Sequence, residues 1–409
     1  MIRSMLKFIF VIFLGAFSIG EIIRFDLGNN IFIKPVDIAI VILLLAWIVH
    51  NFESIIKDIK TDSLFLPIKW VVIIMCISLA VNFKNFSGSE ILVGLSYIVR
   101  WVLYASLFFI VKSFPSKFKE KILYLLLAAG GIVTFFGFLQ YFFYSSLRNL
   151  YYLGWDEHMH RMFSTFLDPN YAGVFFVLYL IFLLSIFLYF FENNKMMHAG
   201  IVGLISVFTL ASIFLTYSRS ALITLLASAI IFCALTKKLK WIIGLILVWG
   251  VFVVIYSKSF YIENINLLRI ASVEARIDSA IIAIQIIKDN PFLGVGFNTY
   301  RYVQTEYGFR NPVGASISHA DAGTDNSFLF IFATTGIIGL ILYLNFILNT
   351  IKRSYISYRK RTNRNIQKYI SVIIIASMGG IIINSLFINS LFYSFILVWM
   401  WILLGLNEE

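Results

Sequence analysis

The sequence predicts an all-α, polytopic membrane protein with one large loop outside the bilayer. Hydrophobic residues make up 60% of the 409 residues and charged residues only 13%, whereas a soluble domain has about 25% charged residues. The mean hydropathy is +0.89. The apolar residues fall into repeated runs of about the 20 residues that a helix needs to cross a bilayer. Because no internal repeat or low-complexity linker divides the chain, we expect residues 1–409 to form a single integral membrane domain.

We expect about twelve membrane-spanning helices. In chain order, the apolar runs are residues 5–23, 36–50, 64–82, 91–111, 121–144, 170–191, 198–216, 219–236, 240–257, 326–351, 369–387 and 390–406. The first run follows Arg3 and Lys7 as in a signal peptide, but no small-residue cleavage site follows, so we interpret it as a retained span. The second run is short and the last two form a tight hairpin, so eleven spans remain an alternative.

Basic connecting segments predict the orientation in the membrane. Lys and Arg gather in segments 112–121, 237–240 and 352–368, and short basic loops face the cytoplasm. With the N-terminus inside and twelve spans, all three segments and both termini are cytoplasmic. The polar loops 145–168 and 258–325 then face the periplasm or the cell exterior. The net charge of +12 therefore orients the chain in the bilayer and does not indicate a nucleic-acid partner.

The sequence indicates no disulfide and no metal centre. Cys76 and Cys233 both lie inside apolar runs, so we interpret them as small buried hydrophobic residues. Four potential metal ligands lie together in the loop before the sixth run: Asp156, Glu157, His158 and His160. Their spacing is not typical of a metal site, and a solvated loop is the preferred interpretation.

A first polar cluster precedes the sixth run. Its sequence is Phe166-Leu167-Asp168-Pro169-Asn170. Asp168 is a favourable helix N-cap and Pro169 suits the first helical position, so a capped helix is one interpretation. The alternative is a polar ledge at the outer rim of the bundle, where Arg161 and Asn170 contact a sugar or a phosphate.

Two arginines occur where the bilayer makes charge costly. Arg219 lies in Thr216-Tyr217-Ser218-Arg219-Ser220, which separates two apolar runs. A structural arginine that snorkels is one interpretation, and a phosphate ligand is the other, because a guanidinium matches phosphate bidentately. Arg100 lies in the middle of an apolar run. We expect it to face the bundle interior and pair there, or to line a lipid-phosphate cavity.

The long loop 258–325 contains its own expected structure. Residues 273–288 suit an amphipathic helix, which Pro291 ends, and Gly294-Val295-Gly296 suits a tight backbone segment. This glycine pair follows a helix, so it is not a dinucleotide-binding motif. Arg276, near the helix start, is either a second cation for a diphosphate or an ordinary surface arginine.

A polar stretch, residues 318–329, closes the long loop. Asp325 or His319 could accept a proton from a sugar hydroxyl. The alternatives are that Asp325 caps the following helix and that His319 is a solvated loop residue.

In this order, the motifs resemble those of the O-antigen polymerase and O-antigen ligase family of bacterial membrane glycan-assembly enzymes. The matching segments are Phe166-Leu167-Asp168-Pro169-Asn170, Ser218-Arg219-Ser220, Arg276 with Asn290-Pro291-Phe292-Leu293-Gly294-Val295-Gly296, and Asp325-Asn326-Ser327-Phe328-Leu329 with Gly336-Ile337-Ile338-Gly339. The resemblance implies a C-type glycosyltransferase fold and a glycan donor linked to undecaprenyl diphosphate. It also implies an active site on the outer face of the cytoplasmic membrane.

The resemblance assigns roles to individual residues. Arg219 and Arg276 match the two family arginines that hold the diphosphate, and two fixed guanidiniums would stabilise the leaving group without a metal or cofactor. Asp325 occupies the position where ligases usually carry a histidine, which favours a polymerase. Further substrate contacts are expected from Arg100, Arg161, Asp168, Asn170, Ser218, His319 and Asn326.

The sequence therefore predicts a polymerase that joins lipid-linked oligosaccharide repeats. A ligase that moves finished polymer to a lipid or protein acceptor is the first alternative, and a polysaccharide transporter or flippase is the second. The expected partners are the lipid-linked oligosaccharide, the bilayer and, from the resemblance alone, a chain-length regulator protein.

Overall fold

The computed structural model describes residues 2–28, 31–52, 59–241, 244, 250, 271–309, 323–362 and 365–408. Within them, seven helices are long and apolar enough to cross a membrane, and four shorter apolar helices accompany them. The chain is therefore a helical membrane protein. The expected span 240–257 lies almost wholly outside the described residues, so the expected total of twelve spans stays a prediction.

The apolar helices follow the predicted runs closely. They are α1 (Ile2–Ile19), α2 (Pro35–His50), α4 (Phe65–Val81), α5 (Gly88–Lys112), α6 (Ser116–Phe143), α7 (Pro169–Glu192), α8 (Met196–Leu215), α9 (Arg219–Thr236), α13 (Ser327–Lys360), α14 (Ile366–Asn384) and α15 (Ser394–Leu406). Short 3-10 helices lie at Phe83–Asn85, Arg148–Leu153, Ser164–Phe166 and Ser390–Phe392. The loop before α13 contains α11 (Ala271–Asp289) and α12 (Tyr300–Glu306).

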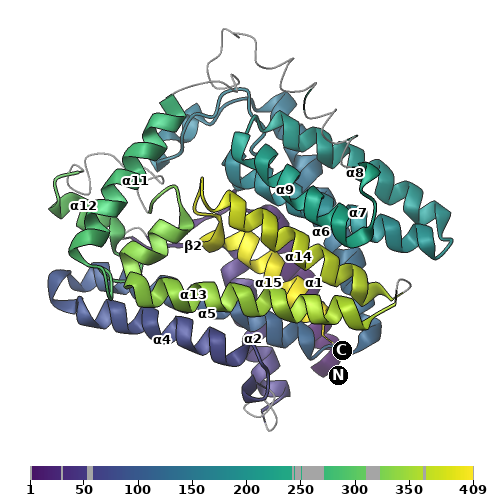
Figure 1. Cartoon of the computed structure of the whole chain (residues 1–409), viewed down its shortest axis with the longest axis horizontal. Helices are drawn as coiled ribbons and strands as arrows, with labels where there is room; N and C mark the ends of the chain where they lie inside the picture. Colours follow the sequence, from purple (N-terminus) through teal and green to yellow (C-terminus); the bar gives the residue numbers. More distant parts are fainter. Residues whose placement is uncertain are drawn as a thin grey trace.

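The helix α7 lies at the centre of one half of the bundle. Its side chains are buried on every face, as expected for a helix that is apolar all round. It packs against α8, α9 and α14, while α4, α5 and α13 run side by side along the opposite edge (Figure 1). The labelled N- and C-terminal ends lie close together at one end of the molecule.

Three local expectations were wrong. The segments 112–121 and 352–368 are not loops throughout, because α6 already begins at Ser116 and α13 continues to Lys360. Lys and Arg are good helix formers, so the helices extend beyond the apolar runs. A short antiparallel pair, β1 (Phe25–Asp26) and β2 (Phe32–Ile33), also interrupts the expected all-helical chain.

The cysteine prediction was half right. Cys233 is buried, whereas Cys76 is exposed on α4, and both are free thiols. A membrane helix has an apolar face toward lipid as well as one toward the bundle, so an apolar run alone does not place a residue inside.

A kink in α13 receives the connection that follows α11. Gly336 has non-helical angles, with φ +68° and ψ −173°. A Cβ atom there would lie 2.0 Å from the carbonyl oxygen of Phe292, so only glycine permits this close approach. The backbone N–H of Ile337 donates to the carbonyl of Pro291 across the same contact, at 2.8 Å.

The contact continues along the connection. The N–H groups of Val295 and Gly296 donate to the carbonyls of Ala333 and Thr334, at 3.0 and 3.1 Å. These carbonyls lie in the turn before the kink, where the helical ladder is interrupted. Two motifs that lie far apart in the sequence therefore bond directly to each other, and this contact positions α11.

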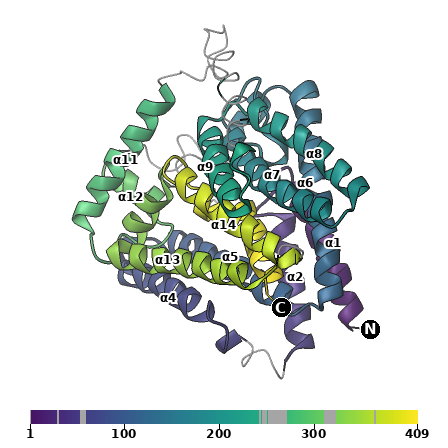
Figure 2. The same cartoon turned by 45° about the vertical axis from the view of Figure 1, so that its right-hand side comes forward.

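The helix α11 lies at the edge of the molecule beside α12 in both views (Figures 1 and 2). Its inner face buries Ala283, Ile286 and Ile287. The outer face also carries apolar residues, with Ile277 and Ile281 more than half exposed. The helix is present where the sequence predicted it, but its outward face is less polar than an amphipathic helix in water would have.

Candidate functional site

A polar cavity of about 770 Å³ opens at the end of the bundle that is remote from the chain termini. Segments far apart in the sequence line it, including the β1–β2 region, the loop before α7, the start of α11, the start of α13 and the turn before α15. From this end, α7 extends to Glu192 through 24 residues, a length of about 36 Å. The cavity and the terminal end of the bundle are therefore separated by a full membrane-spanning helix.

Several helices begin at this cavity. The lining residues Lys34, Asp168 and Ser394 stand at the starts of α2, α7 and α15, and Asp325 lies two residues before α13. Helix N-termini carry partial positive charge. Their convergence makes this end of the bundle favourable for an anionic ligand.

Arg276 is the central charge of the cavity. It lies near the start of α11, is half-buried and lines the cavity. Its positive charge acts on Asp168, on Asp325 and on Arg219. The sequence predicted all four as site residues, and they form one electrostatic group.

The two carboxyl groups have perturbed acidity. Burial raises the pKa of Asp325, and the charge of Arg276 opposes this effect. Burial also raises the pKa of Asp168. The hydrogen bonds from the N–H groups of Tyr171 and Asn170 and the charges of Arg161 and Arg276 lower this pKa and so oppose the effect of burial. A carboxylate with a raised pKa is a stronger base than an ordinary one.

Asp325 does not cap α13, so that alternative was wrong. The cap is Asn326, whose Oδ1 accepts hydrogen bonds from the N–H groups of Phe328 at 2.9 Å and Leu329 at 3.1 Å. The backbone N–H of Asp325 instead donates to Ser279 Oγ of α11, at 3.3 Å. This bond joins the backbone of Asp325 to α11, the helix that carries Arg276. Asn326 is not among the residues that line the cavity.

The ledge residues before α7 are bonded to one another. Asp168 Oδ1 accepts from the N–H groups of Asn170 and Tyr171, at 2.6 and 3.2 Å, which confirms the predicted cap. Asn170 Oδ1 accepts from Arg161 at 3.3 Å and from Ser218 Oγ at 3.0 Å. Arg161, which is 5% exposed, and Asn170 line the cavity and also hold its rim in place.

Arg219 lies beside the cavity and is not among its lining residues. It is the first residue of α9, after the short turn that the sequence predicted, and Ser218 caps that helix by accepting from the N–H of Ala221 at 3.4 Å. Because Ser218 also bonds Asn170, the start of α9 is tied to the cavity wall.

Arg100 faces the bundle interior, as predicted. Its guanidinium lies 3.3 Å from the carboxylate of Asp37 and donates to the carbonyl of Phe32. Asp37 also accepts from the hydroxyl of Tyr104 at 2.5 Å. Arg100 also lines the cavity, as a charge that is already paired.

Two histidines of the polar loops differ in what the structure describes. His319 lies outside the described residues. His158 lines the cavity with its Nε2 3.9 Å from Asp168 Oδ2. Within the described part of the chain, no three His, Cys, Asp or Glu side chains gather as metal ligands.

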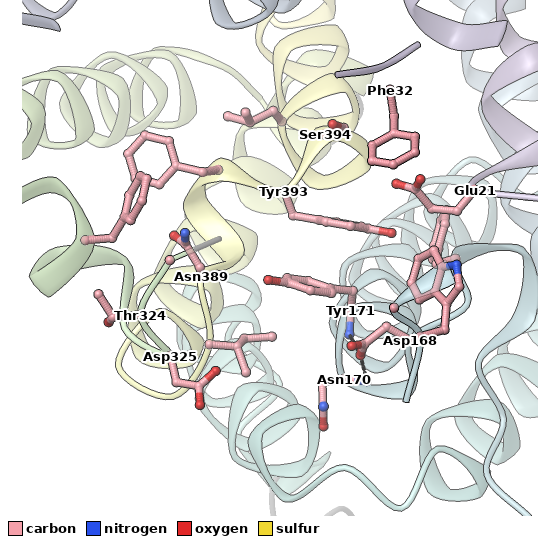
Figure 3. Close-up of a pocket in the computed structure, with 18 of the residues that line it drawn as sticks. Glu21, Phe32, Asp168, Asn170, Tyr171, Thr324, Asp325, Asn389, Tyr393 and Ser394 are labelled. Carbon is pink, nitrogen blue, oxygen red and sulfur yellow. Dashed lines mark hydrogen bonds between the residues drawn. The ribbon is translucent and has the colours of Figure 1, made fainter. Parts of the chain in front are cut away.

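The sequence did not predict the aromatic pair that lies beside these residues. Tyr171 and Tyr393 stack at 4.0 Å between ring centroids, with 9° between their planes. Figure 3 shows this pair between Asp325 and Asn170 on one side and Glu21, Phe32 and Ser394 on the other. Charged residues at the borders of apolar runs, such as Glu21 and Lys34, were the available signal.

The fold and the cavity define an integral membrane protein with a charged cavity at one end of its helix bundle. Residues 204–344 match the sequence model of the family described as O-antigen ligase. The match agrees with the family that the sequence motifs resemble. The matched segment contains Arg219, Arg276 and Asp325. A comparison with curated proteins found no match.

Proposed function

We propose that this protein is a surface-polysaccharide polymerase that joins oligosaccharide repeat units carried on undecaprenyl diphosphate. The observation that carries the proposal is the placement of Arg276 and Asp325 in one cavity, at helix starts that favour an anion. The family is a glycosyltransferase-like group, which supports a transfer reaction.

The proposed step is a displacement at the anomeric carbon of the donor glycan. The acceptor hydroxyl oxygen forms the new bond to this carbon, and the bond from the carbon to the phosphate oxygen breaks. The bonding electron pair leaves with undecaprenyl diphosphate, and the hydroxyl proton passes to Asp325. Arg276 and Arg219 stabilise the charge that develops on the diphosphate, so the reaction needs no metal ion or nucleotide sugar.

We infer that the cavity faces the periplasm or the cell exterior. Lys112, Lys119 and Arg353 lie at the other end of the bundle, near the end of α15. Lys119 and Arg353 both bond Glu408, and Lys112 and Arg353 both pair with Asp62. Basic helix ends remain in the cytoplasm. Both termini are then cytoplasmic, and the donor reaches the cavity on the outer face of the bacterial cytoplasmic membrane.

Purified protein in proteoliposomes with lipid-linked repeat units tests the catalytic roles. Arg276→Gln should abolish chain elongation, because one cation of the diphosphate site is lost, whereas the control Glu274→Gln, an exposed change on the same helix, should elongate normally. Full elongation by Arg276→Gln at equal protein amounts would refute the proposed mechanism.

Chelation tests the absence of a metal requirement. EDTA should leave elongation by the wild-type protein intact, since guanidinium groups neutralise the leaving group. Activity that EDTA abolishes and a divalent cation restores would contradict this part of the proposal.

A ligase is the second candidate, because the matched family model carries that description. The two activities differ in what accumulates in a strain that lacks the chain. Single lipid-linked repeat units indicate a lost polymerase, and long chains stranded on the carrier indicate a lost ligase. Lipid-linked glycan that crosses proteoliposome membranes without bond formation would instead support a transporter. A chain-length regulator remains a proposed partner of the polymerase.

A further inference from the structure

The cavity has two walls of different chemistry. The first carries Arg276, Asp325 and Asp168. The second, here called the aromatic wall, consists of Glu21, Arg24, Phe32, Lys34, Tyr97, Arg100, Trp155 and Ser394, all of which line the same cavity. The stacked tyrosines lie between Asp325 of the first wall and Glu21, Phe32 and Ser394 of the second (Figure 3).

Two of the cations in the aromatic wall, Lys34 and Arg100, are paired with carboxylates. Lys34 lies 2.7 Å from the carboxylate of Glu21 and donates to Ser394 Oγ at 3.0 Å. Arg100 is paired with Asp37. Buried charges that are already paired have little remaining attraction for a diphosphate, but they hold hydrogen-bond donors and acceptors in fixed positions.

The same wall presents flat apolar faces beside these polar groups. The guanidinium of Arg24 lies over the rings of Phe32 and Trp155, 4.2 and 4.9 Å from their centroids. The guanidinium of Arg100 lies 4.9 Å from the ring centroid of Tyr97. Such contacts hold planar side chains rigidly, and aromatic faces pack well against the C–H bonds of a sugar ring.

Two buried polar atoms of the cavity remain to be satisfied. The hydroxyl of Tyr393 and Oδ1 of Asn389 have no hydrogen-bond partner among the described residues. Figure 3 shows the Tyr393 hydroxyl on the Glu21 side of the stacked pair. Buried polar atoms normally have a partner, and the hydroxyls of a ligand would supply one.

We propose that the aromatic wall is a binding site for the acceptor glycan and takes an uncharged, hydroxyl-rich sugar. This inference rests on the proposed function, since only a transfer reaction needs a second glycan. An acceptor glycan bound to the aromatic wall would have Asp325 and the proposed diphosphate ligands, Arg276 and Arg219, on the other side of the cavity. Because Lys34 and Arg100 are already paired, they favour a neutral sugar over an acidic one.

Two soluble probes separate this proposal from the diphosphate site. The first is the oligosaccharide that mild acid releases from the lipid-linked pool of the host strain, and the second is farnesyl diphosphate, which has no sugar. Binding of each to the full-length protein in nanodiscs is measured by saturation-transfer NMR and calorimetry. Trp155→Ala should weaken oligosaccharide binding by at least about tenfold, as truncating an aromatic anchor does, and weaken farnesyl diphosphate binding far less. Arg276→Gln should show the reverse pattern.

Controls keep the test decisive. Tyr152→Ala removes a ring that is 75% exposed in the same loop and outside the cavity lining, so it should bind the oligosaccharide like wild type. Trp155→Phe should restore most of the affinity, and Phe32→Ala should repeat the loss if Trp155→Ala does not fold.

Equal weakening of both probes by Trp155→Ala, or of neither, would overturn the proposal. So would a released repeat that contains an acidic sugar and binds more tightly than its carboxyl-reduced form. If farnesyl diphosphate fails to bind the wild-type protein, the proposed diphosphate site is wrong, and the oligosaccharide result still decides the aromatic wall.

Discussion

At the scale of single residues, the carboxylates of the cavity differ in how much of their bonding capacity the fold uses. Asp168 caps α7 with one oxygen and has its other oxygen 3.9 Å from His158. Asp325 has no capping role, because Asn326 caps α13. Its carboxylate is thus the better candidate for accepting a proton during the reaction.

We predict that Asp325→Asn lowers the elongation rate by about 10²–10⁴-fold, the usual contribution of a general base. The wild-type rate should fall as the pH decreases through the pKa of Asp325, because protonation removes the base. Burial raises this pKa, so the acidic limb of the pH–rate profile should lie above the ordinary carboxyl range. Rates of the wild type and of the control Asp278→Asn, an exposed change on α11, are measured across pH. If the Asp325→Asn variant keeps the acidic limb of the pH–rate profile, that limb reports the titration of another group.

Substitution of Asp168 separates capping from chemistry. Asp168→Ala should cost about 0.5–2 kcal/mol of stability, because the α7 cap is lost. Asp168→Asn should retain that stability, since Asn caps equally well. Thermal unfolding in detergent measures both. If Asp168→Asn unfolds as easily as Asp168→Ala, the cap is not the stabilising feature. Elongation by the stable Asn variant then reports whether the charge matters.

At the scale of elements, the contact between α13 and the connection after α11 sets the position of Arg276. The connection fits because Gly336 interrupts the helical hydrogen bonds of α13. It also fits because residue 294 is a glycine: a Cβ atom there would lie 2.5 Å from the backbone of Thr334. The α11 helix also packs directly on α13. The placement of the central cation therefore depends on two glycines that do not line the cavity.

Gly336→Ala should destabilise the protein by about 1–3 kcal/mol, the cost of a strained backbone, and should reduce elongation because α11 shifts. Gly200→Ala is the matched control, since a Cβ at that helical glycine meets nothing within 4 Å. Thermal unfolding and elongation rates of both variants are compared with those of the wild type. A Gly336→Ala protein as stable and active as Gly200→Ala would show that the kink does not position the site.

The sequence predicted local features well and tertiary ones poorly. The cap at Asp168 and the turn before Arg219 follow from neighbouring residues alone, and both were found. The cap of α13 was assigned one residue too early, because Asp and Asn are equivalent cap residues. Most of the aromatic wall was missed, since Glu21, Phe32 and Trp155 meet only through the fold.

At the scale of the whole molecule, the two ends of the bundle have separate tasks. The end remote from the cavity is held by charge pairs. Arg353 bonds Asp62 at 2.6 and 3.0 Å and also bonds Glu408, and Lys112 lies 2.5 Å from Asp62. The side chain of Asp62 is fully buried. These bonds join the starts and ends of α4, α5 and α13 to the C-terminus.

Arg353→Ala should destabilise the protein by about 3 kcal/mol, as breaking a buried ion pair does, without altering the acceptor or diphosphate preferences of the cavity. Lys112 still neutralises Asp62, which keeps the loss near the lower end of the usual range. Equilibrium unfolding in mixed micelles measures the effect. The exposed Arg359→Ala in the same helix is the control. Equal stability of the two variants would show that the ion pairs of Arg353 do not stabilise the protein.

The size distribution of glycan formed by the purified protein from lipid-linked single repeat units decides whether the protein is a polymerase. We expect a ladder of longer lipid-linked chains with release of undecaprenyl diphosphate, and no ladder with Arg276→Gln. Unextended repeats in the wild-type reaction, with no undecaprenyl diphosphate released, would contradict it.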